Sequence, residues 1–240
     1  MKTVGIIGGI APESTIEYYR AIIRAFRERK QDGSYPSIII NSIDLQKILS
    51  LITANDLAAV AEYLLVELQR LARAGADFGV ISSNTPHIVF DEVLSRSPIP
   101  LISIVEATCQ AATTRGLERV GLFGTRFTMQ GRFYSDVLAR VGITLVLPDE
   151  AEQNYIHEHY MGEFIQGIFL PETRERLLAI AHRLAAEQGI EALILGGTEL
   201  PLILTAASVE HVGIPFLDTS QIHVNAVVAE LTQESSESVR

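Results

Sequence analysis

Two segments of the sequence place small polar residues directly after an apolar run of the kind that forms a buried strand. The first is GVISSNTPH at residues 79–87, and the second is LILGGTELP at residues 193–201. In parallel α/β sheets, ligands collect beyond the carboxyl ends of the strands. Hydroxyl and amide side chains at such a place, with free backbone amides at the start of a following helix, can bind a carboxylate or a phosphate.

Two further turns have the same character, GGIAPEST at residues 8–15 and GTRFTM at residues 124–129. Their glycines allow the backbone to approach a ligand closely. One such turn is common in any α/β protein and carries little information. Four of them, two in each half of the chain, favour a small-molecule site built from strand ends.

The elements that must position these turns alternate between short apolar runs and longer amphipathic runs. The apolar runs lack period-two alternation, so we expect strands buried on both faces, as in parallel sheets. The expected strands are residues 4–7, 37–40, 78–81, 101–104, 119–123, 143–147, 192–195 and 215–217. The expected helices are residues 14–29, 55–74 and 172–188. Ser14 is the expected N-cap of the first helix, and this alternation predicts right-handed βαβ units.

The two halves of the sequence repeat one another weakly. TVGIIGG near the start parallels RVGLFGT at residues 119–125, and LARAGADFGVISSNTPH parallels LAAEQGIEALILGGTELP. We therefore expect an α/β protein with two similar lobes, each a parallel sheet flanked by helices. The first lobe is expected to hold residues 1–98 and 210–240, and the second residues 99–209. The polar end TQESSESVR is expected to be frayed.

Composition excludes several classes of partner. The 240 residues are 48% apolar and carry a formal net charge of −10 without a basic run, so we expect neither nucleic acid nor an anionic membrane as a partner. No segment has the roughly 20 apolar residues of a membrane span. The single cysteine, Cys109, is expected to pack as a small hydrophobe and fits a reducing compartment, so the expected location is the cytoplasm.

Common cofactor and metal motifs are absent from the sequence. The glycine spacing of GIIGGIAP is not that of a dinucleotide-binding loop, and neither a phosphate-binding P-loop nor a GxSxG elbow occurs. His157 and His159 stand two residues apart on an expected helix and point in different directions. We therefore predict no metal site and no cofactor, and we expect His157 to be packed.

The four turns, in this order, resemble the pattern of the aspartate/glutamate racemase family. The segments that match it are VGIIGGIAPESTIEYY, SSNTPH, GTRFTMQGRFY, GGTELP and IPFLDTSQIHVNAVV, which together span almost the whole chain. The resemblance implies two lobes with pseudo-twofold symmetry and the site in the cleft between them. It also implies a homodimeric, cytoplasmic amino-acid isomerase that works without pyridoxal phosphate.

In that family, two cysteines flank the α-carbon of the substrate, one removing a proton and the other delivering one. The resemblance places Ser83 and Gly197 at these two positions. It implies a small amino acid or dicarboxylate as the ligand. The residues that it assigns to substrate binding are Ile10, Ala11, Asn84, Thr85 and Thr198, with Thr125 and Thr128 as weaker candidates for recognising the substrate side chain.

The residues at the two cysteine positions decide the expected activity. A thiol has an ordinary pKa of about 8.5, whereas a serine hydroxyl is a far weaker acid and glycine has no side chain. Losing one positioned acid or base costs about 10²–10⁴ in rate. We therefore predict that the two-cysteine racemisation is absent or strongly reduced. Glu199, Ser82 and His87 are the candidate substitutes for the missing base.

Several interpretations remain open at the level of sequence. The protein is an enzyme with shifted chemistry, or it binds an amino acid or dicarboxylate without turnover as a sensor or regulatory partner. Alternatively, it is a true racemase crystallised with altered residues at positions 83 and 197. A family member without any ligand is the remaining interpretation.

Overall fold

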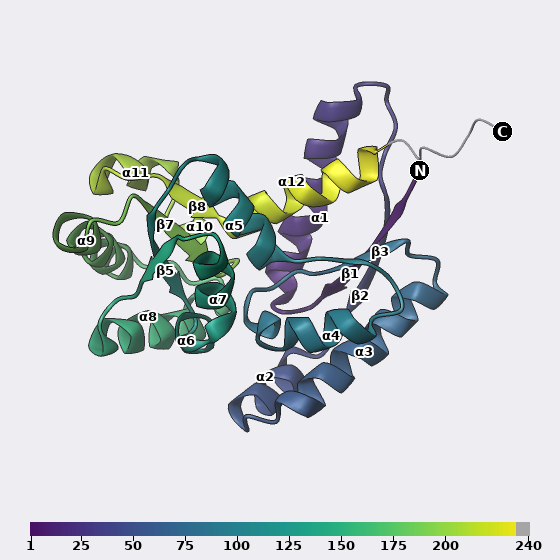
Figure 1. The fold of residues 1–240 in the computed structure, drawn as a ribbon, viewed down its shortest axis with the longest axis horizontal. Helices are drawn as coiled ribbons and strands as arrows, with labels where there is room; N and C mark the ends of the chain where they lie inside the picture. The colour runs from purple at the N-terminus through teal and green to yellow at the C-terminus, as the bar shows by residue number, and fades with distance from the viewer. Residues whose placement is uncertain (234–240) are drawn as a thin grey trace. The chain divides into compact units, whose positions relative to one another are not determined.

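The computed structural model describes residues 1–233, so the end that was expected to be frayed lies, from residue 234 on, outside the described part. The chain forms two compact units. The first holds Met1–Ser103 and the segment from His223 on, and the second holds Ile104–Ile222. Each unit contains one four-stranded sheet flanked by helices (Figure 1).

The sheet of the first unit is parallel and has the order β2-β1-β3-β4. Its strands are β1 (Thr3–Gly8), β2 (Ser37–Ser42), β3 (Phe78–Ile81) and β4 (Leu101–Ile102). The helical elements of this part of the chain are α1 (Pro12–Lys30), α2 (Leu45–Thr53), α3 (Leu57–Arg73), the 3₁₀ helix η1 (Thr85–Val89), α4 (Phe90–Arg96) and α12 (Thr219–Thr232).

The sheet of the second unit repeats this topology with the order β6-β5-β7-β8, again all parallel. Its strands are β5 (Arg119–Gly124), β6 (Thr144–Val146), β7 (Ala192–Gly196) and β8 (Phe216–Asp218). The helical elements are α5 (Ile104–Thr114), α6 (Arg126–Gln130), α7 (Arg132–Arg140), α8 (Glu150–Gly162), η2 (Phe164–Gln166), α9 (Pro171–Gln188), α10 (Leu200–Ile203) and α11 (Ala206–Val212). The prediction of two similar parallel α/β lobes is confirmed.

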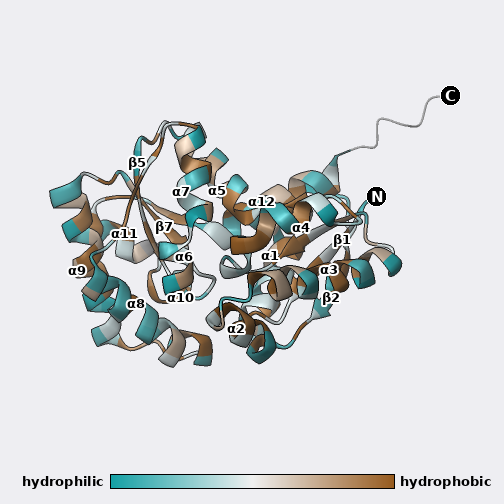
Figure 2. Ribbon diagram, turned by 60° about the horizontal axis from the view of Figure 1, so that its bottom comes forward, coloured by the Kyte–Doolittle hydropathy of each residue, from teal (hydrophilic) through white to brown (hydrophobic). Residues whose placement is uncertain are grey.

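Each unit has its own apolar core, in which the central strands are buried on both faces. β7 is buried along its whole length, as the unbroken apolar run predicted. Figure 2 shows apolar residues gathered where helices face the strands of each unit. Cys109 is part of the core of the second unit, and its Sγ lies 3.7 Å from the carbonyl oxygen of Val137. The interpretation of Cys109 as a packed hydrophobe is confirmed, and burial raises the pKa of its thiol.

The first helix begins earlier than expected. α1 begins at Pro12 with Ala11 as its N-cap, so the prediction of Ser14 as the N-cap is wrong. A proline fits the first helical position because it lacks the N–H that would be left unpaired there. Ser14 lies in the first turn of the helix, where its Oγ donates a hydrogen bond to the carbonyl oxygen of Ala11 at 2.8 Å.

The limits of the two units fall later than residues 98 and 209. β8 pairs in parallel with β7, with Phe216 opposite Leu193, so the strand that was expected in the first lobe lies in the second sheet. Only the part of α12 from His223 on belongs to the first unit, where Val224 and Val227 join the core. No helix within residues 1–233 combines the length and the apolar character that crossing a membrane requires.

Candidate functional site

The four polar turns lie at the carboxyl ends of the two central strands of each sheet. β1 and β3 are parallel neighbours with Ile7 opposite Ile81, so the turns that follow them lie at the same edge of the first sheet. β5 and β7 are parallel neighbours with Gly124 opposite Gly196, so the same holds for the second sheet. Each unit therefore brings two of the predicted turns together, as the strand-end rule requires.

The turn after β1 is too tight for side chains at its glycines. Gly9 has φ +85°, and a Cβ there would lie 2.4 Å from the carbonyl oxygen of Ile43. The backbone N–H of Gly9 donates to Oγ1 of Thr15 at 2.8 Å, which ties the turn to α1. Ile10 and Ala11, the predicted ligand contacts, are both buried, and the peptide bond that joins them is cis.

The turn after β3 contains Ser83, which the resemblance placed at a cysteine position of the family. Ser83 is buried, and its carbonyl oxygen accepts a hydrogen bond from Nδ1 of His87 at 3.0 Å. Asn84 and Thr85, which begin η1, are buried beside it. Ser82 has no exposed surface, and its hydroxyl donates to the carbonyl oxygen of Ile7 at 3.1 Å. The Ser82 hydroxyl proton is thus directed at a backbone carbonyl oxygen, which is not a general base.

The candidate base His87 is placed as a structural side chain. Its ring stacks on Phe90 with 4.8 Å between centroids, and its Nδ1 donates to the Ser83 carbonyl. Burial, with a smaller contribution from the nearby His223, lowers the pKa of His87 to about 3. Such an imidazole is neutral at pH 7, and its Nδ1 already serves as a donor to a backbone carbonyl, so this nitrogen does not accept a proton.

His223 has a similar structural environment in the first unit. Its Nε2 lies 2.9 Å from the carbonyl oxygen of Ile102 and donates to it, while its Nδ1 accepts from the hydroxyl of Tyr18 at 2.8 Å. Burial lowers the pKa of His223 to about 4. With both ring nitrogens engaged, His223 joins α1, α12 and β4.

The turn after β5 is closed by its own threonines. Oγ1 of Thr125 accepts from the backbone N–H of Thr128 at 3.2 Å, and the two hydroxyl oxygens lie 3.1 Å apart. The next residue, Arg126, donates its backbone N–H to Nδ1 of the half-buried His157 at 3.2 Å. Burial lowers the pKa of His157, and the charge of Arg126 adds to the effect. Thr125 and Thr128 therefore serve as a helix cap at the edge where the β7 turn also lies.

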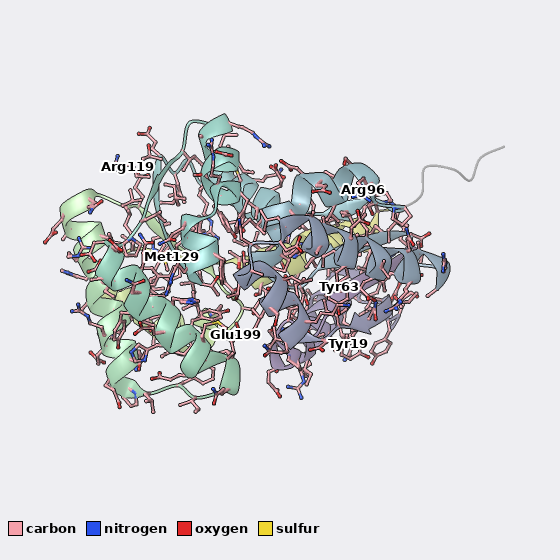
Figure 3. The ribbon with its side chains drawn as sticks, turned by 90° about the horizontal axis from the view of Figure 1, so that it is seen from below. Tyr19, Tyr63, Arg96, Arg119, Met129 and Glu199 are labelled. Carbon is pink, nitrogen blue, oxygen red and sulfur yellow. The ribbon has the colours of Figure 1, made fainter. Side chains whose placement is uncertain are left out.

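Three oxygen-bearing side chains meet at the turn after β7: Thr198 and the buried Glu199 of the turn itself, and the buried Tyr160 of α8. Glu199, labelled in Figure 3, is only 4% exposed. Its Oε2 accepts a hydrogen bond from the hydroxyl of Thr198 at 2.9 Å and another from the hydroxyl of Tyr160 on α8. Burial, followed by the negative charge of Glu199, raises the pKa of Tyr160 well above its usual value. The phenol is therefore a proton-bearing donor to the carboxylate.

Tyr160 also explains why residue 197 is glycine. A Cβ at Gly197 would lie 2.4 Å from Cε2, 2.6 Å from the hydroxyl oxygen and 2.8 Å from Cζ of Tyr160. The space that a cysteine side chain would need at this position is filled by the phenol. Tyr160 is not among the residues that were predicted for the site. The sequence signal for the contact between Tyr160 and residue 197 is Gly197 itself, because a buried glycine leaves a space that a neighbouring side chain must fill.

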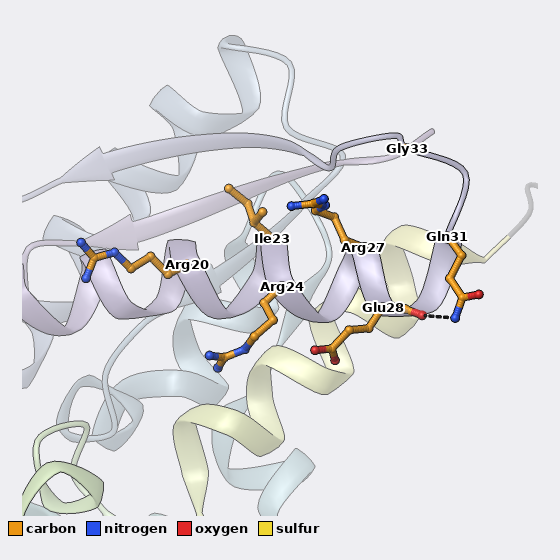
Figure 4. Close-up of a pocket in the computed structure, with 7 residues that line it drawn as sticks. All are labelled: Arg20, Ile23, Arg24, Arg27, Glu28, Gln31 and Gly33. Carbon is orange, nitrogen blue, oxygen red and sulfur yellow. Dashed lines mark hydrogen bonds between the residues drawn. The ribbon is translucent and has the colours of Figure 1, made fainter.

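A separate cavity of about 590 Å³ lies along α1 in the first unit (Figure 4). None of the residues that were predicted for the site lines it. The lining residues are Arg20, Ile23, Arg24, Arg27, Glu28, Gln31 and Gly33. Arginines on one side of a surface helix are usually a solvated face, so we assign this cavity no role. Within residues 1–233, no group of three His, Cys, Asp or Glu side chains is arranged to hold a metal ion.

Known proteins are similar to this chain along almost its whole length. The family model described as Asp/Glu/Hydantoin racemase matches residues 7–227. The broad specificity amino-acid racemase RacX of Bacillus subtilis (strain 168) is 24% identical over 231 residues, which cover 94% of this chain and 96% of that protein.

Two solved structures are also similar to this chain along almost its whole length. A candidate Asp/Glu racemase from Yersinia pestis has a TM-score of 0.88 and 31% identity, covering 97% of this chain and 100% of its own. An aspartate racemase homologue from Pyrococcus horikoshii OT3 has a TM-score of 0.83 and 31% identity, with the same coverage of 97% and 100%.

Proposed function

Because the chain belongs to the Asp/Glu/hydantoin racemase family, we propose that it binds a small amino acid or dicarboxylate at the turns that follow its central strands. The observation that supports this most is the pairing of β1 with β3 and of β5 with β7, which groups the predicted turns at one edge of each sheet. Asn84, Thr85 and Thr198 bind the α-carboxylate and amino group, aided by the turn at Ile10 and Ala11.

The proposal excludes racemisation by a pair of cysteines. The residues at the two family positions are Ser83 and Gly197, and the only cysteine of the chain, Cys109, is buried in the core of the second unit. The fit of Tyr160 into the space beside Gly197 favours a glycine that belongs to the native protein over one introduced by alteration. A sensor or regulatory protein that binds without racemising its ligand is consistent with these features.

We propose that the protein acts without pyridoxal phosphate and that it is a homodimer in the cytoplasm. Pyridoxal phosphate enzymes hold their cofactor through a lysine Schiff base. The lysines of the chain are Lys2, Lys30 and Lys47. None of them lies in a strand-end turn: Lys2 pairs with Glu230, Lys30 ends α1, and Lys47 lies 4.0 Å from the ring centroid of Tyr63.

Ligand binding is expected to raise the melting temperature of the full chain. We expect this with at least one of L- and D-aspartate, L- and D-glutamate and succinate. A ligand at 100 times its dissociation constant adds about 2.7 kcal/mol to the free energy of unfolding. For a chain of this size that corresponds to a shift of about 5–10 °C. Differential scanning fluorimetry measures the shift.

Two threonine variants control the thermal experiment. Thr198→Ala is expected to reduce the shift, whereas Thr53→Ala, at an exposed position that ends α2, is expected to leave it unchanged. The absence of a shift with every ligand of the panel would contradict the proposed function. Chiral chromatography of the same mixtures is expected to show no interconversion of enantiomers.

A further inference from the structure

The carboxylate of Glu199 lies one hydrogen bond away from the place of the missing cysteine side chain. The hydroxyl oxygen of Tyr160 is 2.6 Å from a Cβ built on Gly197, and the same hydroxyl donates to Oε2 of Glu199. Thr198 donates to this oxygen as well, at 2.9 Å. An acid/base side chain is therefore present at the β7 turn, although residue 197 contributes none.

We propose that Glu199 is a base that exchanges the α-proton of a bound amino acid from one face only, with Tyr160 as a positioning residue for its carboxylate. This inference rests on the proposed function, because it requires an amino acid at the β7 turn. It narrows the ligand to compounds with an acidic C–H next to a carboxylate and an amino group.

The proton balance of the step closes without a cofactor. The Cα–H bond breaks, its electron pair stays on the α-carbon and its carboxylate, and the proton moves to Glu199, which becomes a carboxylic acid. Solvent then replaces this proton, and Glu199 returns the new one to the same face of the α-carbon. Tyr160 keeps its own proton throughout, because burial and the nearby carboxylate disfavour a phenolate.

The other family position, Ser83, lies in the first unit and carries a hydroxyl in place of a thiol. The Ser83 hydroxyl is a far weaker acid than a thiol, and Nδ1 of His87 donates to the Ser83 carbonyl oxygen. A single carboxylate that both removes and returns the proton does so on one side of the α-carbon. The reaction that follows is hydrogen exchange with retention of configuration, not racemisation.

The test uses the full chain in D₂O with L- or D-aspartate and L- or D-glutamate. Proton NMR follows the loss of the α-proton signal, and chiral chromatography follows the configuration. We expect one enantiomer to exchange and to keep its configuration, while the other does not exchange. Glu199→Gln is expected to lower the exchange rate by about 10²–10⁴.

Tyr160→Phe separates positioning from packing, because it keeps the ring and removes only the hydrogen bond to Glu199. We expect it to lower the exchange rate at saturating ligand by about tenfold, with the dissociation constant unchanged. The matched control is Tyr155→Phe on the same helix, which is expected to exchange at the rate of the unmodified chain. Circular dichroism establishes that each variant is folded.

Exchange of both enantiomers at equal rates, or exchange that survives Glu199→Gln in the folded protein, would overturn the assignment. Binding of an amino acid without any exchange would overturn it as well and leave the proposed function standing. Absence of both binding and exchange would overturn the proposed function together with this inference.

Discussion

Gly197→Cys, which introduces the residue that the resemblance implies at this position, is expected to destabilise the protein by about 3 kcal/mol, since overpacking a filled core costs about 1–3 kcal/mol. The new Cβ would lie 2.4 Å from Cε2 of Tyr160, closer than real contacts allow. The ring cannot turn away without cost, because it is buried and its hydroxyl is bonded to Glu199. Urea unfolding measures the loss.

The matched control for this variant is Gly162→Cys. A Cβ at Gly162 meets no atom within 4 Å, and its backbone does not require glycine, so we expect a change of less than about 0.5 kcal/mol. The double variant Tyr160→Ala/Gly197→Cys is expected to lose less stability than the two single variants lose in total. Without the phenol the new cysteine side chain has room, and the cysteine fills part of the space that the phenol leaves. Equal stability of Gly197→Cys and the unmodified chain would show that Tyr160 does not fill this space.

Cysteines at positions 83 and 197 are expected to give the protein racemase activity. The triple variant Ser83→Cys/Tyr160→Ala/Gly197→Cys is expected to racemise aspartate or glutamate at least about 10² times faster than the unmodified chain. Two thiols supply the acid and base that serine and glycine lack, and removing the phenol makes room for the second one. Chiral chromatography of each pure enantiomer measures the rate.

The control for the triple variant carries alanine at positions 83, 160 and 197. It opens the same space without a thiol, so it is expected to remain inactive. If the cysteine variant is folded, binds its ligand and is no faster than the alanine control, the remaining turns do not form a site for racemisation. A double variant that keeps Tyr160 is expected to gain less, because the phenol competes with the thiol for space.

The strands were predictable because parallel strands buried on both faces need uninterrupted apolar runs. Each of the eight expected runs overlaps a strand, and the range 78–81 is matched by Phe78–Ile81. Helix starts were harder to predict, since Pro12 and Ser14 are both typical of a first turn and only the backbone path selects between them. The sequence also did not predict which sheet β8 joins. The placement of β8 depends on its pairing with β7, and the local sequence pattern does not encode this pairing.

The candidate site was predictable in its turns but not in its chemistry. Asn84, Thr85 and Thr198 follow strands as the sequence indicated. The short-range pattern around Tyr160 shows only an apolar stripe of a helix. Its function as the neighbour of Gly197 depends on how α8 packs against the end of β7, a tertiary contact that no local pattern encodes.

The most direct test of ligand binding at the strand-end turns is an amide nitrogen–proton NMR titration of the full chain with the ligand that gives the largest thermal shift. We predict saturable changes concentrated at the amides of Asn84, Thr85 and Thr198, with smaller changes at Ala11. Changes that concentrate instead on the arginines of α1, or no saturable change in any of these turns, would contradict the account.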